Sequence, residues 1–367
     1  MTAGALSLFL AGDVMLGRGI DQILARPSDP RLHEGWVTSA EGYVRLAEER
    51  HGALPRRVGP AYVWGDLLAE LDARAPDLRI VNLETAITTS DAYEPKGINY
   101  RMRPANAGVL RAARIDACLL ANNHVLDWGA AGLVETLGTL DALGIAYAGA
   151  GRDAAGAAAP LILPAPQGRL ILAAFGCPTS GIPPHWQAGP GRPGVALLPG
   201  GDDAALAAVT RAAEGRRPGD ILAVSNHWGS NWGHEIPPRQ RRLARRLIDE
   251  AGADLVFGHS SHHPKAVEFH QGKPIVYGSG DLLNDYEGIG GREEFRAHLA
   301  LAWFAAFDAA GALVSLEMVP FRIERFRLTR ATEEEAAWLA ATLSRESARR
   351  GTAITRSPAG AFRAAPA

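Results

Sequence analysis

The sequence predicts an α/β protein, and three observations support this prediction. Short apolar runs of strand length alternate along the chain with longer amphipathic segments, which is the order of elements in α/β folds. The chain has 367 residues, enough for one large domain or two smaller ones. Several apolar runs end in Asp, Asn, Glu or His, the residue types that line the ligand crevice at the carboxyl ends of strands in α/β sheets.

The apolar runs are the predicted strands, and the first of them begins at Leu6. Their ranges are 6–12, 78–84, 117–122, 146–151, 170–176, 220–227, 254–259 and 274–281. Helices are predicted at about 63–75, 130–143, 202–215 and 236–251, whereas the Pro- and Gly-rich stretch 176–201 is predicted to be a long loop. Residues 1–330 are expected to form one domain, followed over 331–367 by a charged helix and a small-residue tail that frays.

The composition argues against several classes of partner. The chain is 47% apolar and 21% charged, with a formal net charge of -2, as in ordinary soluble proteins. Its arginines are balanced by acids, so we expect no nucleic acid and no membrane partner. The N-terminal apolar run lacks a basic flank and is too short to span a bilayer. With only two cysteines, of which Cys118 lies in a predicted core strand, a cytoplasmic location is the expectation.

Metal-competent side chains follow five of the predicted strands. These residues are Asp13, Asn82 and Glu84, Asn122 to His124, His227, and His259 with His262. Carboxylate, amide and imidazole donors together suit a divalent ion, and six or more of them are enough for two ions. The residues alone leave Mn, Fe, Zn, Mg and Ca open. A histidine in the core is the usual alternative for any one of them, but five strand ends with the same character favour a shared metal site.

The segment "LLANNH" has two readings. Asn is a good turn former, and its side chain can cap the helix expected to begin near Gly129. In the alternative reading, Asn122, Asn123 and His124 belong to the metal site. Both readings are open on the residues alone.

Five motifs resemble the CapA family, which is named for poly-γ-glutamate capsule biosynthesis and belongs to the calcineurin-like metallophosphoesterase superfamily. They are "AGDVMLGR", "VNLETAIT", "LANNHVLDWG", "SNHWG" and "GHSSHHPKAVE" followed by "KPIVYGSGDLLND", in the family's order between about residues 6 and 325. The resemblance implies a four-layer α/β/β/α sandwich with one or two metal ions at the carboxyl ends of the strands. The metal ligands that it implies are Asp13, Glu84, Asn123, His227, His259 and His262, with His124 beside them as in the superfamily's Asn-His pair.

Two departures from the superfamily pattern bear on the reaction. The first motif usually reads Asp-x-His, but its third position here is Met15, which cannot replace an imidazole on a hard metal. The last motif reads "GHSSH" in place of Gly-His-x-His, so the final ligand is either His262 or His263. Hydrolysis of phosphate esters by the standard two-metal route is therefore in doubt.

Four residues are candidates for binding the substrate. Lys96 and Arg101 lie in a loop after the Glu84 strand, where they could hold a carboxylate or phosphate or could simply be solvated. Trp228 and Trp232 follow His227 and would suit a peptide or an aromatic side chain, although packing in the core is the common role of Trp.

His298 precedes a strand-like apolar run and is either a surface residue or an added acid/base. The CapA-like fold is known to house a peptide epimerase that acts on a lasso-peptide precursor. The main prediction is therefore a metal-dependent epimerase that inverts the α-carbon of a C-terminal residue, with Asp13 and His298 as the acid/base pair. Its partner would be a peptide substrate, with or without a leader-binding protein. The alternatives are a CapA-type metallohydrolase of phosphoesters or poly-γ-glutamate amides, and an accessory protein of capsule-polymer biosynthesis.

Overall fold

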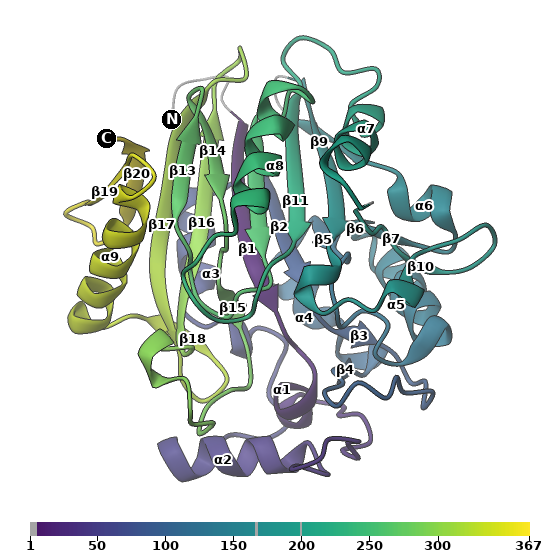
Figure 1. Ribbon diagram of the computed structural model, residues 1–367. Helices are drawn as coiled ribbons and strands as arrows, with labels where there is room; N and C mark the ends of the chain where they lie inside the picture. The colour runs from purple at the N-terminus through teal and green to yellow at the C-terminus, as the bar shows by residue number, and fades with distance from the viewer. Residues whose placement is uncertain (1–5, 166–167, 199) are drawn as a thin grey trace.

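The computed structural model describes residues 6–165, 168–198 and 200–367, and its strands form two large sheets that face each other (Figure 1). The ten-stranded sheet has the order β19-β20-β17-β16-β1-β2-β5-β6, with β15 paired to β1 and β18 paired to β17. Its strands are β1 (Leu6–Val14), β2 (Leu78–Leu83), β5 (Ala117–Leu119), β6 (Ala146–Ala148), β15 (Asp281–Leu283), β16 (Leu299–Phe307), β17 (Leu313–Ile323), β18 (Leu328–Arg330), β19 (Thr352–Arg356) and β20 (Phe362–Pro366).

The six-stranded sheet has the order β13-β14-β12-β11-β9-β8. Its strands are β8 (Leu161–Ala165), β9 (Gly168–Gly176), β11 (Ile221–His227), β12 (Leu255–His259), β13 (Val267–His270) and β14 (Lys273–Val276). Two short pairs complete the strands, namely β3 (Ala86–Ile87) with β4 (Arg101–Met102) and β7 (Ala150–Gly151) with β10 (Gly194–Val195). The pairs β1/β2, β2/β5, β9/β11 and β11/β12 are parallel, so their carboxyl ends lie on the same side of each sheet.

Helices connect the parallel strands and cover the outer faces of the sheets, except the last helix, which packs into the core between the sheets. They are α1 (Arg18–Ile23), α2 (Glu41–His51), α3 (Leu67–Arg74), α4 (Gly108–Ala112), α5 (Gly129–Leu143), α6 (Ala154–Ala158), α7 (Asp202–Ala212), α8 (Pro238–Asp249) and α9 (Glu333–Ala348). Short 3₁₀ turns are η1 (Tyr62–Trp64), η2 (Pro104–Asn106), η3 (Pro178–Ser180), η4 (Pro184–Trp186) and η5 (Glu293–Phe295). None of the helices in the described ranges is long and apolar enough to cross a membrane.

Three apolar cores separate the layers. Along β1 the side chains alternate, so that Leu8 and Leu10 pack toward the six-stranded sheet whereas Phe9 packs toward the helices. The core between the sheets joins Leu8 and Leu10 to Leu172 of β9. A further core lies between the six-stranded sheet and helices α7 and α8, where Leu247 of α8 is fully buried. The layers therefore follow the order helices, sheet, sheet, helices, and the predicted α/β class is confirmed.

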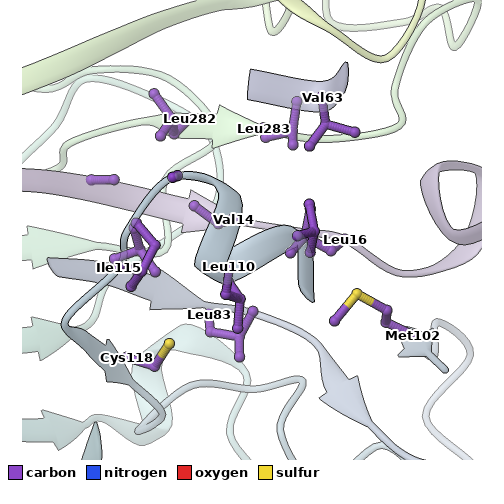
Figure 2. Close-up of a cluster of buried hydrophobic side chains, with 14 of the residues drawn as sticks. Val14, Leu16, Val63, Leu83, Met102, Leu110, Ile115, Cys118, Leu282 and Leu283 are labelled. Atoms are coloured by element: carbon purple, nitrogen blue, oxygen red, sulfur yellow. The ribbon is translucent and has the colours of Figure 1, made fainter. Parts of the chain in front are cut away.

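Apolar side chains next to the polar strand ends anchor these ends in the helix-side core. Figure 2 shows Val14, Leu83 and Leu283, from β1, β2 and β15, in one buried cluster with Cys118 of β5. Burial raises the pKa of the Cys118 thiol, so Cys118 is an inert core residue, as the sequence indicated. Because side chains alternate along a strand, this packing turns Asp13 and Asn82 toward the opposite sheet.

The eight predicted strand positions and the predicted helices are present, with shifts of a few residues at their ends. The prediction of a frayed tail is wrong. Strand β20 pairs with β17 and β19 pairs with β20, so that the chain after α9 extends the ten-stranded sheet. The reason is the alternation in β20: Phe362 is fully buried and Ala364 nearly so, and both pack with Leu339 of α9 in the core between the sheets.

This packing predicts that the tail contributes to global stability. Phe362→Ala removes a fully buried ring, and we expect it to lower the free energy of unfolding by about 3–5 kcal/mol. Ala365→Ser on the exposed side of the same strand is the matched control and should change stability by about 0.5 kcal/mol or less. Urea unfolding followed by circular dichroism measures both, and equal stability of the two variants would show that the tail is not integrated.

Candidate metal centre

The two sheets bring their polar strand ends together at one place. Asp13 on β1 is opposite Asn82 on β2 and opposite Asp281 on β15. His227 on β11 is opposite His259 on β12 in the other sheet. Glycine makes the close approach of β1 to the segment before β15 possible, because a Cβ on Gly12 would lie 1.9 Å from the carbonyl oxygen of Gly280.

Asp13 is shared by two groups of potential metal donors. Asp13, His227 and His259 form one group, and Asp13, His262 and Asp281 form the other; within each group the donor atoms lie within 4.8 Å of one another. Asp13 Oδ1 is 3.9 Å from His227 Nδ1 and 3.7 Å from His259 Nδ1. His262 Nδ1 lies 3.0 Å from Asp281 Oδ1. All five residues are buried, so the cluster is screened from bulk water.

Glu84 and Asn123 border this cluster. Glu84 Oε1 is 4.0 Å from His227 Nε2, and Asn123 Oδ1 is 2.8 Å from the same nitrogen. Asn82 donates from Nδ2 to Asp13 Oδ1 at 2.7 Å and so fixes the orientation of that carboxylate. The structure thus brings together the six residues that the resemblance implied as ligands, and their roles as ligands stay a prediction.

Each residue of the Asn-Asn-His segment has a separate task. Asn122 Oδ1 accepts hydrogen bonds from the backbone N–H groups of His124 and Val125, both at 3.1 Å, so the turn-forming reading holds for Asn122. Helix α5 begins several residues later without a side-chain cap, so the capping part of that reading is wrong. Asn123 instead faces His227, and the ring of His124 lies between Asp127 and Glu84.

His124 is held as a neutral imidazole in a fixed orientation. Its Nδ1 lies 2.6 Å from Asp127 Oδ2, which leaves Nε2 directed toward Glu84 Oε1 at 3.8 Å. Burial lowers the pKa of His124 to about 4 despite the nearby carboxylate of Asp127. Lys96 adds a positive charge here, since its ammonium pairs with Asp127 at 2.9 Å and contacts the carbonyl oxygen of Asn123. Lys96 therefore lies beside the cluster, and its contact with substrate stays a prediction.

The electrostatics of the cluster favour a bound cation. Burial, followed by the charge of Asp281, raises the pKa of Asp13 from an ordinary value of 3.8 to about 7. Burial and the neighbouring charge of Asp13 raise the pKa of Glu84 well above its usual range. Burial lowers the pKa of His259 to about 3 and that of His227 well below normal, so both imidazoles are neutral donors. Neutral imidazoles beside crowded carboxylates are the donor set of a divalent metal site, and the residues present fit one or two such ions.

The structure distinguishes between the two histidines that the sequence left open. His262 faces the cluster through Asp281, whereas His263 turns away and stacks on Phe295 with ring centroids 4.4 Å apart. His263 Nδ1 lies 3.1 Å from the carbonyl oxygen of Pro264. His262 is therefore the candidate ligand, because its ring lies with Asp13 and Asp281 in the cluster. Burial lowers the pKa of His262, but the charges of Asp281 and Asp13 outweigh burial and raise it, so a bound cation would displace a proton from this ring.

Sequence reasoning missed Asp281. It ends the predicted strand 274–281, so the rule that identified the other strand ends also applied to it. Its partner Asn284 donates a hydrogen bond from Nδ2 to Asp281 Oδ2 at 2.8 Å.

Met15 is fully buried, and its sulfur lies 3.7 Å from the hydroxyl of Tyr286. The position at which the superfamily usually has an imidazole thus packs against an aromatic side chain.

A cavity of about 570 Å³ adjoins the cluster, because His262 of the cluster lines it, next to the hydroxyl of Tyr286 at 3.5 Å. Trp232 and His298 also line this cavity. His298 Nε2 lies 3.4 Å from Glu335 Oε1, so it is part of the cavity wall; its role as an acid or base stays a prediction.

Two of the predicted substrate-binding residues have structural roles. Trp228 is buried and donates from its indole N–H to the carbonyl oxygen of Tyr277 at 3.0 Å. Arg101 is buried, stacks on Trp128 at 3.9 Å and binds the carboxylate of Asp91. Tertiary contacts thus occupy both side chains, and their contact with substrate stays a prediction.

An α/β sandwich with buried carboxylates and histidines at its strand ends defines the class of this protein, an α/β protein with a candidate metal centre. Residues 7–286 match the family described as "Bacterial capsule synthesis protein PGA_cap". The chain belongs to this family, and the resemblance to CapA proteins is confirmed.

Its relatives include proteins of capsule and polymer synthesis. A probable polyglutamine synthesis accessory protein of Mycobacterium tuberculosis is 44% identical over 367 residues, which cover 99% of this chain and 96% of that protein. The PGA biosynthesis protein CapA of Bacillus subtilis is 29% identical over 284 residues, which cover 76% of this chain and 63% of that protein. The capsule biosynthesis protein CapA of Bacillus anthracis is 26% identical over 285 residues, covering 76% of this chain and 60% of that protein.

The orientation of the two histidines leads to a prediction about metal content. His262→Ala removes a donor nitrogen beside Asp13 and Asp281, so we expect it to lower the metal bound per protein after loading with Mn²⁺ or Zn²⁺. His263→Ala is the matched control and should keep the wild-type metal content, because its ring faces Phe295. Elemental analysis after gel filtration measures the ratio, and equal loss in both variants would contradict the assignment.

The crowded carboxylates give a second prediction for the chelator-treated protein. The pKa of Asp13 is 3.8 in the unfolded chain and about 7 in the folded protein, so as the pH rises the unfolded state releases this proton before the folded state does. The free energy of unfolding should therefore fall as the pH rises from about 4 to about 7. Asp13→Asn should reduce this fall and raise the melting temperature at pH 7.5 while it weakens metal binding. A melting temperature of Asp13→Asn below that of the chelated wild type would contradict the assigned repulsion.

Proposed function

We propose that this protein is a metal-dependent hydrolase of the CapA type, with the α/β/β/α architecture of the metallophosphoesterase superfamily, that acts on amide bonds of a glutamate polymer. The observation that carries the proposal is the Asp13-centred cluster, which is buried, rich in carboxylates and imidazoles, and connected through His262 to a cavity of about 570 Å³. The names of the relatives, which refer to polyglutamine synthesis and PGA biosynthesis, support a polymer of this kind as the substrate.

An amide is favoured over a phosphate ester by the first motif. Met15 has no donor for a hard metal, and it is fully buried, so it contributes packing and not a ligand. The cluster that remains is asymmetric, with Asp281 and His262 on one side of Asp13 and the His227–His259 pair on the other.

Different residues of the chain orient the donors and transfer protons in the proposed reaction. When bound, a divalent cation supplies Lewis-acid polarisation of the scissile carbonyl and lowers the pKa of water. Asn82 orients Asp13 through a 2.7 Å hydrogen bond. Asp127 holds the ring of His124 so that its Nε2 faces the cluster, where it can take a proton from the attacking water and pass it to the departing amine. The low pKa of His124 keeps the imidazole neutral, so that Nε2 is free to accept this proton and releases it readily afterwards.

Peptide epimerisation is the second candidate function, and one observation favours it. His298 lines the same cavity as His262, so a peptide end held near Asp13 could also face His298. In that reading one of the two residues removes the α-proton and the other returns a proton on the opposite face. The family and its relatives support the polymer reading better.

Hydrolysis predicts a specific set of activities for the Mn²⁺- or Zn²⁺-loaded protein. It should release amines from poly-γ-glutamate and cleave p-nitrophenyl phosphate slowly or not at all. His124→Gln should reduce kcat by about 100-fold or more, because it removes the group that carries the proton from water to the departing amine. His270→Ala is a control at a surface histidine that pairs with Asp249. Efficient cleavage of the phosphoester without cleavage of the polymer would contradict the amide assignment.

Epimerisation is tested in deuterated water with a C-terminal peptide as the probe. Incorporation of one deuteron at the α-carbon, lost in Asp13→Ala and in His298→Ala, would establish it in place of hydrolysis. Chiral amino-acid analysis by mass spectrometry detects the inverted residue.

A further inference from the structure

One wall of the cavity, built by residues other than those of the metal cluster, is basic. Arg50, Arg296 and Arg322 line it together with His298, and these residues come from α2, the loop after η5 and β17. We infer that this wall is an anion subsite that binds a carboxylate of the substrate while the reacting amide lies at the metal cluster, and that Glu335 positions it. The inference rests on the proposed function and adds the residues that select an acidic chain.

The acids of the cavity are already occupied by the protein itself. Glu287 accepts hydrogen bonds from the backbone N–H groups of Arg325 and Phe326, and Glu293 accepts one from Gly291. The guanidinium of Arg50, by contrast, is exposed and makes no hydrogen bond or ion pair within the described ranges of the chain, whereas Arg296 pairs with Glu334 at 3.9 Å and Arg322 with Glu335 at 3.4 Å. Arg50 is therefore the arginine of this wall that is free to meet a ligand, and an arginine matches a carboxylate well.

Glu335 performs two tasks with its two oxygens. Its Oε2 accepts from the backbone N–H of Thr332 at 2.8 Å, which is the capping box that starts α9. Its Oε1 lies 3.4 Å from His298 Nε2 and 3.4 Å from Arg322 Nη1. The start of α9 thus fixes two side chains of the cavity wall. Because α9 follows residue 286, where the family match ends, the chain beyond the matched region contributes to the site.

Burial keeps His298 neutral by lowering its pKa; Glu335 opposes this shift, and Arg322 and Arg50 add to it. The single N–H of a neutral His298 faces Glu335 through Nε2, so Arg50 and Arg322 supply the positive charge that meets a ligand. Glu324, which lies 3.6 Å from Arg322 Nε, completes the set on β17 and the turn after it.

The mouth of the cavity adds an apolar part. Trp36, Ile98 and Ile289 line it and are 59%, 44% and 39% exposed. Exposed side chains of this size can pack on the methylene groups of a chain whose carboxylates reach the arginines. The cavity therefore suits an acidic chain with aliphatic spacers.

Calorimetric binding of two probes to the metal-loaded protein tests the subsite. The probes are a γ-linked glutamate tetramer and the γ-linked isoglutamine tetramer of the same length, in which carboxamides replace the α-carboxylates. We expect the wild type to prefer the glutamate tetramer, and Arg50→Gln to weaken glutamate binding by about tenfold without weakening isoglutamine binding. Arg45→Gln is the matched control, because it lies on the same helix, is exposed and does not line this cavity. Equal binding of the two probes, or wild-type affinity in Arg50→Gln, would overturn the inference.

Two variants separate positioning from helix capping. Glu335→Gln keeps an acceptor for the Thr332 N–H but removes the charge that holds Arg322. We therefore expect the melting temperature to hold while the affinity for the glutamate tetramer falls and the pKa of His298, followed by NMR, also falls. Thr332→Ala removes the other half of the cap and should lower the melting temperature with the affinity unchanged. If Glu335→Gln binds the glutamate tetramer with wild-type affinity and the pKa of His298 does not shift, Glu335 only caps α9, and its positioning role is overturned. Intact probe binding without turnover would contradict only the proposed hydrolysis.

Discussion

The burial of Asp13 among other acids is the constraint on which the rest of this structure depends. Desolvation and the charge of Asp281 both oppose its ionisation, so the carboxylate is costly in the absence of a cation. The surrounding fold holds it there nevertheless, with Val14 and Leu283 locked into the apolar core beside it. Such a cluster lowers the stability of the fold but favours the binding of a divalent ion, and it is therefore the main indication of function.

The neutral histidines and the oriented amides follow from the same burial. His227 and His259 cannot easily carry charge inside the sandwich, and neutrality is the state in which an imidazole binds a metal. Asn82 and Asn122 hydrogen bond within the cluster, and thereby fix the positions of its donors without adding charge. The chemistry of the site is therefore a consequence of placing polar strand ends between two sheets.

The C-terminal segment, α9 with β19 and β20, contributes both to the ten-stranded sheet and to the wall of the cavity. Strand β20 completes the sheet by pairing with β17, and α9 begins with a glutamate that also reaches His298 and Arg322. One residue, Glu335, thus belongs both to a helix cap and to a cavity wall. A part of the chain outside the family match therefore shapes the wall of the cavity.

The sequence by itself determined the α/β class, the strand positions and the polar residues at the strand ends, because hydrophobic periodicity and strand-end chemistry are local properties. It also identified the motifs that place the chain in its family. Tertiary structure decided the choice of His262 over His263, the structural roles of Trp228 and Arg101, and the docking of the tail. These depend on which way a side chain turns and what it meets from distant segments: Phe295 meets His263, Tyr277 meets Trp228, and no local pattern encodes such encounters.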